Sequence, residues 1–408
     1  GTSWTCTYTL VENDRQGSVG FTIGNTSGAD LAGNRLAPVT AVTEGGGVEF
    51  DKTAPTLSAV SMSSTNVNVL TLARAGDSVT LTIDSNSPIN APSCAFFSGG
   101  HAIADVYTLD ISSLAGTSWN CTVSMSDADV DGPITFTIDG TDLAGNALET
   151  VTPDSDIASS TRVITFDKSP PVVSGVTIES SNADATLAKP GDTIELSFST
   201  DIDSTSDSIN VPSCMFMVGG QAVTGEVEIE LGAGSTRDWT CTVELAEQDT
   251  AGMVSFTIDA TDLAGNAMVQ VSTVSDSSSV EFDKAAPTFT SVSLASSNGD
   301  SSYATTGDTV TVTIVASEAI ADPSCSFTVG GAPAAGAEPD VDEVADSAGT
   351  SWTCTYTLVS DDREGSVGFT VGEASGADLA GNLLAPVTTV TGLFEGSCPA
   401  GCAYAPAA

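Results

Sequence analysis

Basic side chains are scarce in this sequence. Its 408 residues include 10 Lys and Arg against 53 Asp and Glu, which gives a formal net charge of −43, and they include a single His. Nucleic acid phosphates and anionic lipid headgroups are bound by clusters of Lys and Arg, which this chain lacks. We therefore expect neither nucleic acid nor an anionic membrane surface as a partner. A surface of one charge sign is mostly solvated, and it attracts divalent cations.

Groups of residues typical of enzymes are also missing. The only histidine, His101, has no counterpart elsewhere in the chain, and no Ser/His/Asp grouping recurs. No glycine-rich phosphate loop opens a helix. Paired carboxylates occur, as in Asp139 and Asp142, but a glycosidase also needs a substrate groove between them. We expect a protein without enzymatic activity and without an organic cofactor.

Long apolar runs and helical periodicity are absent as well. No run of 18 apolar residues occurs, so we expect no membrane insertion. Aromatic residues make up 6%, and short alternating runs rich in Val, Thr and Ser are separated by Gly, Asp and Pro. This pattern predicts an all-β protein. The chain starts without Met or a signal-peptide pattern, and we expect it to be a mature or partial product.

Internal repeats organise the sequence. The segment "FDKTAP" at 50–55 returns as "FDKSPP" and "FDKAAP", and the Asp residues of these copies, Asp51, Asp167 and Asp283, recur at intervals of 116 residues. About seven short strands fit into each period, which is typical of an immunoglobulin-like sandwich. We expect an incomplete C-terminal half-domain, three complete domains arranged end to end, and a tail, with these boundaries: 1–52, 53–168, 169–284, 285–394 and 395–408.

The strands of the first complete period can be placed by their alternation and by the turn residues between them. They are expected at 56–62, 78–83, 92–97, 106–112, 118–125, 132–139 and 161–167, with the glycines after residue 98 forming a hairpin turn.

A set of motifs resembles a known family. "AGDSVTLTI", "PGDTIELSF" and "TGDTVTVTI" near the start of each repeat, a Trp before the sixth strand, "DLAGN" and the closing "FDK" are similar to the bacterial-type Ig-like extender repeats of large secreted adhesins and surface proteins. The resemblance implies spacer modules, some of which hold calcium at junctions between domains. These repeats depart from that pattern by carrying a pair of cysteines.

The cysteines recur with the repeats. Each complete repeat has one in "PSC" and one two residues after the Trp, so we expect the disulfides Cys94–Cys121, Cys214–Cys241 and Cys325–Cys354. Each closed loop should stabilise the fold by about 3 kcal/mol. Cys398 and Cys402 can close a small loop in the tail. Disulfides favour an extracellular or cell-surface location.

Cys6 stands alone in the incomplete half-domain. Its "PSC" partner and the first strands of that sandwich should lie upstream of Gly1. Two interpretations stay open. The chain is a piece of a longer tandem array, or a neighbouring copy completes the half-sandwich and produces head-to-tail polymerisation.

The segment "DLAGN" occurs in all four repeats and is either a structural corner alone or a corner that also binds calcium. Asp and Asn favour turns, and the Gly supplies a left-handed backbone position. Carboxylate and amide oxygens are also calcium ligands. In the two internal repeats an earlier Asp and the closing Asp complete the predicted metal set, whose residues are Asp139, Asp142, Asn146, Asp167, Asp259, Asp262, Asn266 and Asp283.

The function that fits these features is structural. We expect a rod-like extracellular subunit of a fibril, surface appendage or adhesin stalk, with copies of itself as partners. The alternative is a ligand- or carbohydrate-binding adhesion module. A recognition domain should differ from the other repeats in its loops, and the insertion at 330–349 is the most divergent one, but its acidic, Ala- and Gly-rich composition favours a solvated loop. Sequons at Asn25 and Asn120 predict N-linked glycans, and glycans are possible partners.

Overall fold

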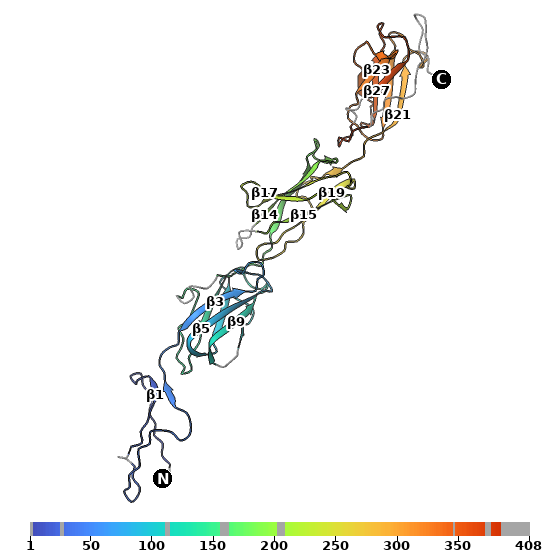
Figure 1. Ribbon diagram of the computed structural model, residues 1–408. Helices are drawn as coiled ribbons and strands as arrows, with labels where there is room; N and C mark the ends of the chain where they lie inside the picture. The colour runs from blue at the N-terminus through green and yellow to red at the C-terminus, as the bar shows by residue number, and fades with distance from the viewer. Residues whose placement is uncertain are drawn as a thin grey trace. The chain divides into compact units, whose positions relative to one another are not determined.

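The computed structural model describes residues 3–24, 28–110, 115–155, 163–201, 209–345, 347–371 and 377–384. All of the regular elements among these residues are β-strands, as predicted (Figure 1). The chain divides into two compact units. The first contains residues 1–171 with 202–210 and 261–268, and the second contains 172–201, 211–260 and 269–408.

The first unit contains one two-layered sandwich between residues 57 and 166. One layer has the strand order β3-β5-β9-β8 and the other β4-β11-β10-β6-β7. The strands are β3 (Leu57–Ser64), β4 (Leu72–Ala73), β5 (Ser78–Asn90), β6 (Ser93–Ser98), β7 (His101–Ala102), β8 (Thr108–Leu109), β9 (Ala115–Ser124), β10 (Gly132–Asp139) and β11 (Thr165–Phe166).

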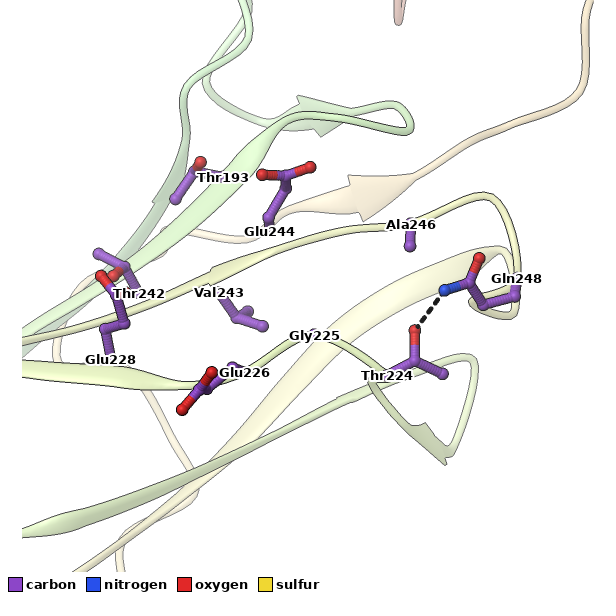
Figure 2. Close-up of a pocket in the computed structure, with 10 residues that line it drawn as sticks. All are labelled: Thr193, Thr224, Gly225, Glu226, Glu228, Thr242, Val243, Glu244, Ala246 and Gln248. Atoms are coloured by element: carbon purple, nitrogen blue, oxygen red, sulfur yellow. Dashed lines mark hydrogen bonds between the residues drawn. The ribbon is translucent and has the colours of Figure 1, made fainter.

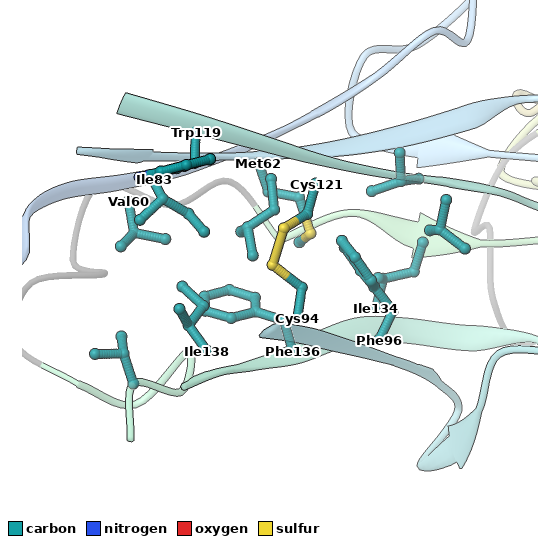
Figure 3. Close-up of a cluster of buried hydrophobic side chains, with 14 of the residues drawn as sticks. Val60, Met62, Ile83, Cys94, Phe96, Trp119, Cys121, Ile134, Phe136 and Ile138 are labelled. Carbon is teal, nitrogen blue, oxygen red and sulfur yellow. A yellow bond between two sulfur atoms is a disulfide. The ribbon is translucent and has the colours of Figure 1, made fainter. Parts of the chain in front are cut away.

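Alternation along the strands builds the core of this sandwich. In β5 the apolar side chains of Val79, Leu81 and Ile83 are fully buried, while the Thr and Ser between them face outward. The opposite layer contributes Phe136 and Ile138 from β10. Figure 3 shows the disulfide between Cys94 and Cys121 among buried side chains that include Ile83, Phe136 and Ile138.

The hairpin between β6 and β7 depends on two glycines. Gly99 and Gly100 have φ values of +54° and +81°, the pair of left-handed positions that a tight two-residue hairpin turn requires. A Cβ atom on Gly99 would lie 2.4 Å from the carbonyl oxygen of Asp131, whereas one on Gly100 would meet nothing within 4 Å. The turn therefore brings the hairpin close to the loop before β10.

Residues 1–52 form no sandwich core in the described structure. Their strands β1 (Gly17–Val19) and β2 (Val48–Phe50) pair only with each other. Trp4 is 88% exposed, while its counterparts Trp119, Trp239 and Trp352 are 3%, 8% and 6% exposed. The apolar residues of this segment thus lack the partner strands that bury their equivalents.

The second unit contains two more pairs of sheets. The first pair has the orders β12-β14-β18-β17 and β13-β20-β19-β15-β16, and the second has β21-β22-β26-β25 and β24-β23-β27. The strands are β12 (Val172–Ser180), β13 (Leu187–Ala188), β14 (Thr193–Asp201), β15 (Ser213–Val218), β16 (Gln221–Ala222), β17 (Glu228–Leu231), β18 (Asp238–Glu244), β19 (Gly252–Asp259), β20 (Glu281–Phe282), β21 (Phe289–Ser296), β22 (Thr309–Ala316), β23 (Cys325–Val329), β24 (Ala332–Pro333), β25 (Asp340–Glu343), β26 (Ser351–Thr357) and β27 (Val367–Val371).

These paired sheets make the protein a series of tandem immunoglobulin-like β-sandwiches. Two details differ from the sequence expectation. Short strands β4 and β13 pair in parallel with the closing strands β11 and β20, which alternation could not indicate. The insertion at 330–349 supplies β25, an edge strand paired with β26, because Val341 packs against the core.

Candidate functional site

The repeated Asp-Leu-Ala-Gly-Asn segment forms a hydrogen-bonded turn. In the copy at 142–146, the Asp142 carboxylate accepts hydrogen bonds from the backbone N–H groups of Ala144 (2.9 Å) and Asn146 (2.8 Å) and from the Asn146 side-chain amide (2.7 Å). Asp suits this position because its short side chain reaches backbone groups a few residues ahead. Gly145 has a φ of +92°, which favours glycine.

The same turn is built in the other three repeats. Asp30, Asp262 and Asp378 each accept from the backbone and side-chain amides of the Asn four residues later. Burial raises the pKa of Asp142, but the hydrogen bonds from Asn146, Ala144 and Gly145 outweigh it, so the net pKa lies below its ordinary value. The Asp142 carboxylate is therefore held as an anion inside its turn.

Three of the four turns also contact the end of the preceding repeat. The side-chain amide of the turn Asn donates a second hydrogen bond to the backbone carbonyl of the preceding closing Asp. We call this contact the junction clamp, and its three copies are Asn146 to Asp51 (3.1 Å), Asn266 to Asp167 (2.9 Å) and Asn382 to Asp283 (3.0 Å).

The structure divides the predicted calcium set differently from the sequence expectation. We expected Asp167 beside Asp139 and Asp142 of its own repeat, but it lies at the other end of β10. The closing strand β11 pairs Phe166 with Gly132, at the start of β10, while Asp139 ends that strand. About seven residues of strand, roughly 24 Å, separate the two ends. Asp167 and Asp283 instead meet the turn of the following repeat.

The remaining members of the predicted set are satisfied locally. Asp139 accepts from the Thr150 hydroxyl (2.6 Å), and Asp259 accepts from the Gln270 side-chain amide (2.7 Å). Both are exposed at the ends of their strands. They do not join Asp142 or Asp262 in one cluster.

One group of three carboxylates does come together at a junction. Oxygens of Asp283, Glu318 and Asp378 lie within 4.8 Å of one another. Burial, followed by the negative charges of Asp283 and Asp378, raises the pKa of Glu318. Sequence reasoning missed Glu318 and the Asp378 partner. Glu318 reaches Asp378 because Ile320, two residues later, forms a β-bridge with Asp378, and no pattern in the sequence indicates that bridge.

We call this group of Asp283, Glu318 and Asp378 the acidic junction, and it offers the oxygen ligands that a hard divalent cation prefers. Calcium takes six to eight oxygen ligands, and three carboxylates offer three to six of them. The junction clamp places the Asn382 amide on the Asp283 carbonyl in the same region. Mutual repulsion among the three carboxylates is the feature that a bound cation would relieve.

The structure contains the three disulfides that the cysteine spacing predicts. They are Cys94–Cys121, Cys214–Cys241 and Cys325–Cys354, each joining the two layers of a sandwich. Cys6 is free and exposed. Cys398 and Cys402 lie outside the described residues.

Of the two predicted glycosylation sites, the structure describes one, Asn120. Asn120 lies on β9 and accepts a hydrogen bond from the Thr82 hydroxyl (2.9 Å) on its outer face. Its side chain is half-buried. Asn25 lies outside the described residues. Glycosylation at both positions stays a prediction.

A pocket of about 430 Å³ lies beside β17 and β18 in the second unit. Figure 2 shows three carboxylates in its lining, Glu226, Glu228 and Glu244, and a hydrogen bond from Gln248 to Thr224 (3.1 Å). Its remaining lining is formed by Thr193, Gly225, Thr242, Val243 and Ala246. The lining includes no cationic side chain, so the pocket suits a positively charged or hydroxyl-bearing group.

Comparison with known proteins gives only distant similarities. No family model and no curated protein matches the chain. A marsupial T cell receptor is 12% identical, with a TM-score of 0.31 over 78% of this chain and 100% of the receptor chain. The mouse nectin-like molecule 4 ectodomain is 14% identical, with a TM-score of 0.25 over 82% of this chain and 95% of its own.

Among the described residues, no helix is long and apolar enough to cross a membrane.

Proposed function

We propose that the chain is a structural extracellular protein, a series of disulfide-bonded Ig-like domains that acts as a spacer in a fibril, surface appendage or adhesin stalk. The observation that carries this proposal is the junction clamp, which recurs at Asp51, Asp167 and Asp283. The same chemistry at every junction supports a function of the repeat and not of one specialised domain.

The clamp has the properties of a restraint on bending. The turn Asp accepts from the turn Asn, so the Asn amide is already oriented before it reaches the neighbouring carbonyl. The segment after each closing Asp contains a Pro within four residues, and Pro restricts its own φ and the residue before it. Three interlayer disulfides support an oxidising location outside the cytosol.

Small-angle X-ray scattering tests this proposal. We expect the triple variant Asn146→Ala, Asn266→Ala, Asn382→Ala to keep its β-structure by circular dichroism but to show a broader distribution of dimensions than the wild type. The matched control is Asn86→Ala, because the Asn86 amide donates to Thr56 within one sandwich. Identical scattering from the triple variant and the wild type would reject the clamp as the restraint.

We further propose that the acidic junction of Asp283, Glu318 and Asp378 binds calcium, in place of the set expected from sequence. The three carboxylates supply the oxygen ligands. Burial, followed by the negative charges of Asp283 and Asp378, raises the pKa of Glu318, and a cation between the carboxylates would offset that repulsion. Calcium would hold the closing Asp of one repeat against the turn of the next. Its role is to make that junction more rigid.

Calcium titration of wild type and Glu318→Gln tests this second proposal. Calcium should raise the unfolding midpoint of the wild type, and chelator should reverse the change. Glu318→Gln removes one ligand charge, so calcium should shift its midpoint less, while without calcium the variant should be at least as stable because a repulsive charge is gone. Equal calcium shifts in both proteins would place the ion elsewhere, and no shift in either would reject calcium.

An adhesion module that binds a ligand or carbohydrate is the second candidate function. The pocket beside β17 and β18 is the observation that favours it. Nuclear magnetic resonance titration with cationic and carbohydrate ligands should shift the signals of Thr224 and Gln248 if this pocket binds them. Glu226→Gln should weaken the binding of a cationic ligand.

A further inference from the structure

A second contact between successive repeats involves a loop asparagine. The Asn66 side-chain amide donates to the Asp77 carboxylate (2.8 Å) and to the backbone carbonyl of Ala264 (2.9 Å), within the first compact unit. Its carbonyl oxygen accepts from the N–H groups of Asn68 and Val69 (both 3.0 Å). Asn66 is 2% exposed and fully hydrogen-bonded, so its orientation is fixed.

The same arrangement occurs in the second unit. The Asn182 amide donates to the Asp192 carboxylate (2.8 Å) and to the carbonyl of Ala380 (2.8 Å). Both acceptors, Ala264 and Ala380, are the Ala of a "DLAGN" turn, and they are 0% and 3% exposed. We call this pairing of a loop Asn with the turn Ala of the next repeat the loop clasp.

Asn298 has the structure of a clasp donor without the acceptor. Its backbone N–H donates to the Ser296 hydroxyl (3.1 Å), and its amide donates to the Asp308 carboxylate (2.8 Å), as in the two filled copies. Its carbonyl oxygen accepts from the N–H of Asp300 (3.2 Å). The second amide hydrogen, which the two other loops give to an Ala carbonyl, has no acceptor among the described residues.

One turn has the structure of an acceptor without the donor. The turn at 30–34 makes the internal hydrogen bonds of the clasped turns, with Asp30 accepting from Ala32 (2.9 Å) and Asn34 (2.8 Å). Ala32 is exposed, in contrast to the buried Ala264 and Ala380. Ala144 is exposed as well, but its turn is clamped to Asp51. In both filled copies the clamp and the clasp of a turn contact the same preceding repeat, so that turn would take its clasp from the repeat of Asp51. The side-chain amide of Asn34, by contrast, clamps no carbonyl among the described residues.

We propose that the Asn298 loop of one copy binds the 30–34 turn of a second copy, with the Asn298 amide donating to the Ala32 carbonyl. This head-to-tail contact rests on the proposed structural function and names its partner. The two filled copies of the clasp in the same chain join a loop Asn of this kind to a turn Ala of this kind. Because both surfaces belong to a strongly acidic chain, association should strengthen as salt screens the repulsion.

Sedimentation velocity of the full chain tests the contact. The chain should carry Cys6→Ser, so that the free thiol cannot crosslink copies. We expect the sedimentation coefficient to rise with protein concentration, and to rise more at about 1 M than at about 0.1 M salt. Asn298→Ala should weaken association at least about tenfold, because it removes the donor.

Substitutions in the turns distinguish a loss of association between copies from a loss of folding. Ala32→Trp should block association because Ala32 must become buried, and Ala144→Trp is the matched control on a turn that does not dock.

Association that persists in Asn298→Ala and Ala32→Trp would overturn the proposal, as would a wild type that stays monomeric under all conditions. A monomeric wild type whose dimensions still depend on the junction clamps would leave the structural function standing. A monomer whose Asn298 loop binds a cyclic Asp-Leu-Ala-Gly-Asn peptide would indicate a different occupant.

Discussion

At the scale of residues, the short polar side chains of the turns have two roles: they order the turn itself and they contact the neighbouring repeat. Asp142 orders the turn that contains it, and the Asn146 so oriented reaches the neighbouring repeat. A buried hydrogen bond contributes more when its partners are already oriented, because less side-chain entropy is lost. Asp and Asn are therefore the residues on which both folding and the junctions depend.

Asp142→Asn should destabilise the first sandwich in a pH-dependent way. The variant amide would face the Asn146 amide, donor against donor, at a cost of about 1–3 kcal/mol. Hydrogen bonds hold the folded pKa of Asp142 below its ordinary 3.8, so its stabilising contribution is present above that value and is lost as pH falls through the folded pKa. The difference in unfolding midpoint between wild type and variant should therefore be largest at neutral pH and shrink in acid.

Thermal unfolding followed by circular dichroism from neutral pH to about pH 2 measures this difference. Asp139→Asn is the exposed control, since that carboxylate accepts only from Thr150 among the hydrogen bonds described. A gap between wild type and Asp142→Asn that does not change with pH would contradict the assigned charge of Asp142.

At the scale of elements, paired sheets, hairpin turns and disulfides position the repeat ends. The hairpin glycines after β6 and the loop before β10 approach so closely that backbone meets backbone. Such contacts tolerate no side chain, unlike the alternating positions of β5, where size and polarity decide burial.

Gly99→Ala should destabilise the first sandwich more than Gly100→Ala. Both positions have positive φ, so both variants lose about 1 kcal/mol or more from backbone strain. Only a Cβ on Gly99 collides with the Asp131 carbonyl, at 2.4 Å, which forces the loop to move. The difference between the two variants in free energy of unfolding, measured by urea unfolding, gives the cost of the collision. Equal losses of stability would show that the loop before β10 moves away at no cost.

Removing the Cys94–Cys121 disulfide should lower the stability of the same sandwich. The double variant Cys94→Ala, Cys121→Ala opens a loop of 27 residues, which should cost about 3 kcal/mol. Scanning calorimetry of the full chain should show one unfolding transition moved to lower temperature. Cys6→Ser is the control, because Cys6 forms no disulfide and is exposed, and a comparable shift in this control would refute the assignment.

The sequence allowed much of the fold to be predicted but less of the site. Alternation and the repeated "PSC" and Trp-x-Cys motifs marked the main strands, because one-sided burial leaves a period of two. The sequence expectation placed Asp167 beside Asp139 and Asp142, because the two-residue pairing that puts it at the other end of the strand cannot be seen in the pattern. It missed Glu318 because the junction joins residues from two repeats, and local periodicity carries no information about that contact.

At the scale of the whole molecule, the charge is almost entirely negative. Salt bridges within the described ranges include Lys189–Asp192 and Arg237–Asp201. The closing Lys168 is used differently, because its ammonium donates to the backbone carbonyls of Asp127 (2.7 Å) and Asp129 (2.6 Å). Lys52 and Lys284 likewise donate to backbone carbonyls. Ten cationic side chains against 53 acidic ones leave most carboxylates without a cationic partner.

Salt should therefore stabilise the folded chain. Folding brings the carboxylates closer together than they are in the unfolded chain, and screening lowers that cost. Raising sodium chloride from about 0.01 M to about 0.15 M shortens the Debye length from about 30 Å to about 8 Å, and the unfolding midpoint should rise over this range. Replacing sodium with choline at equal ionic strength should give the same rise in the unfolding midpoint, because screening depends on charge and not on a specific ion.

A rise in the midpoint with calcium that exceeds the rise with either salt at matched ionic strength, and that Glu318→Gln reduces, would separate binding at the acidic junction from general screening. A midpoint that falls or stays constant with sodium chloride would show that repulsion among these carboxylates does not limit the stability of the fold.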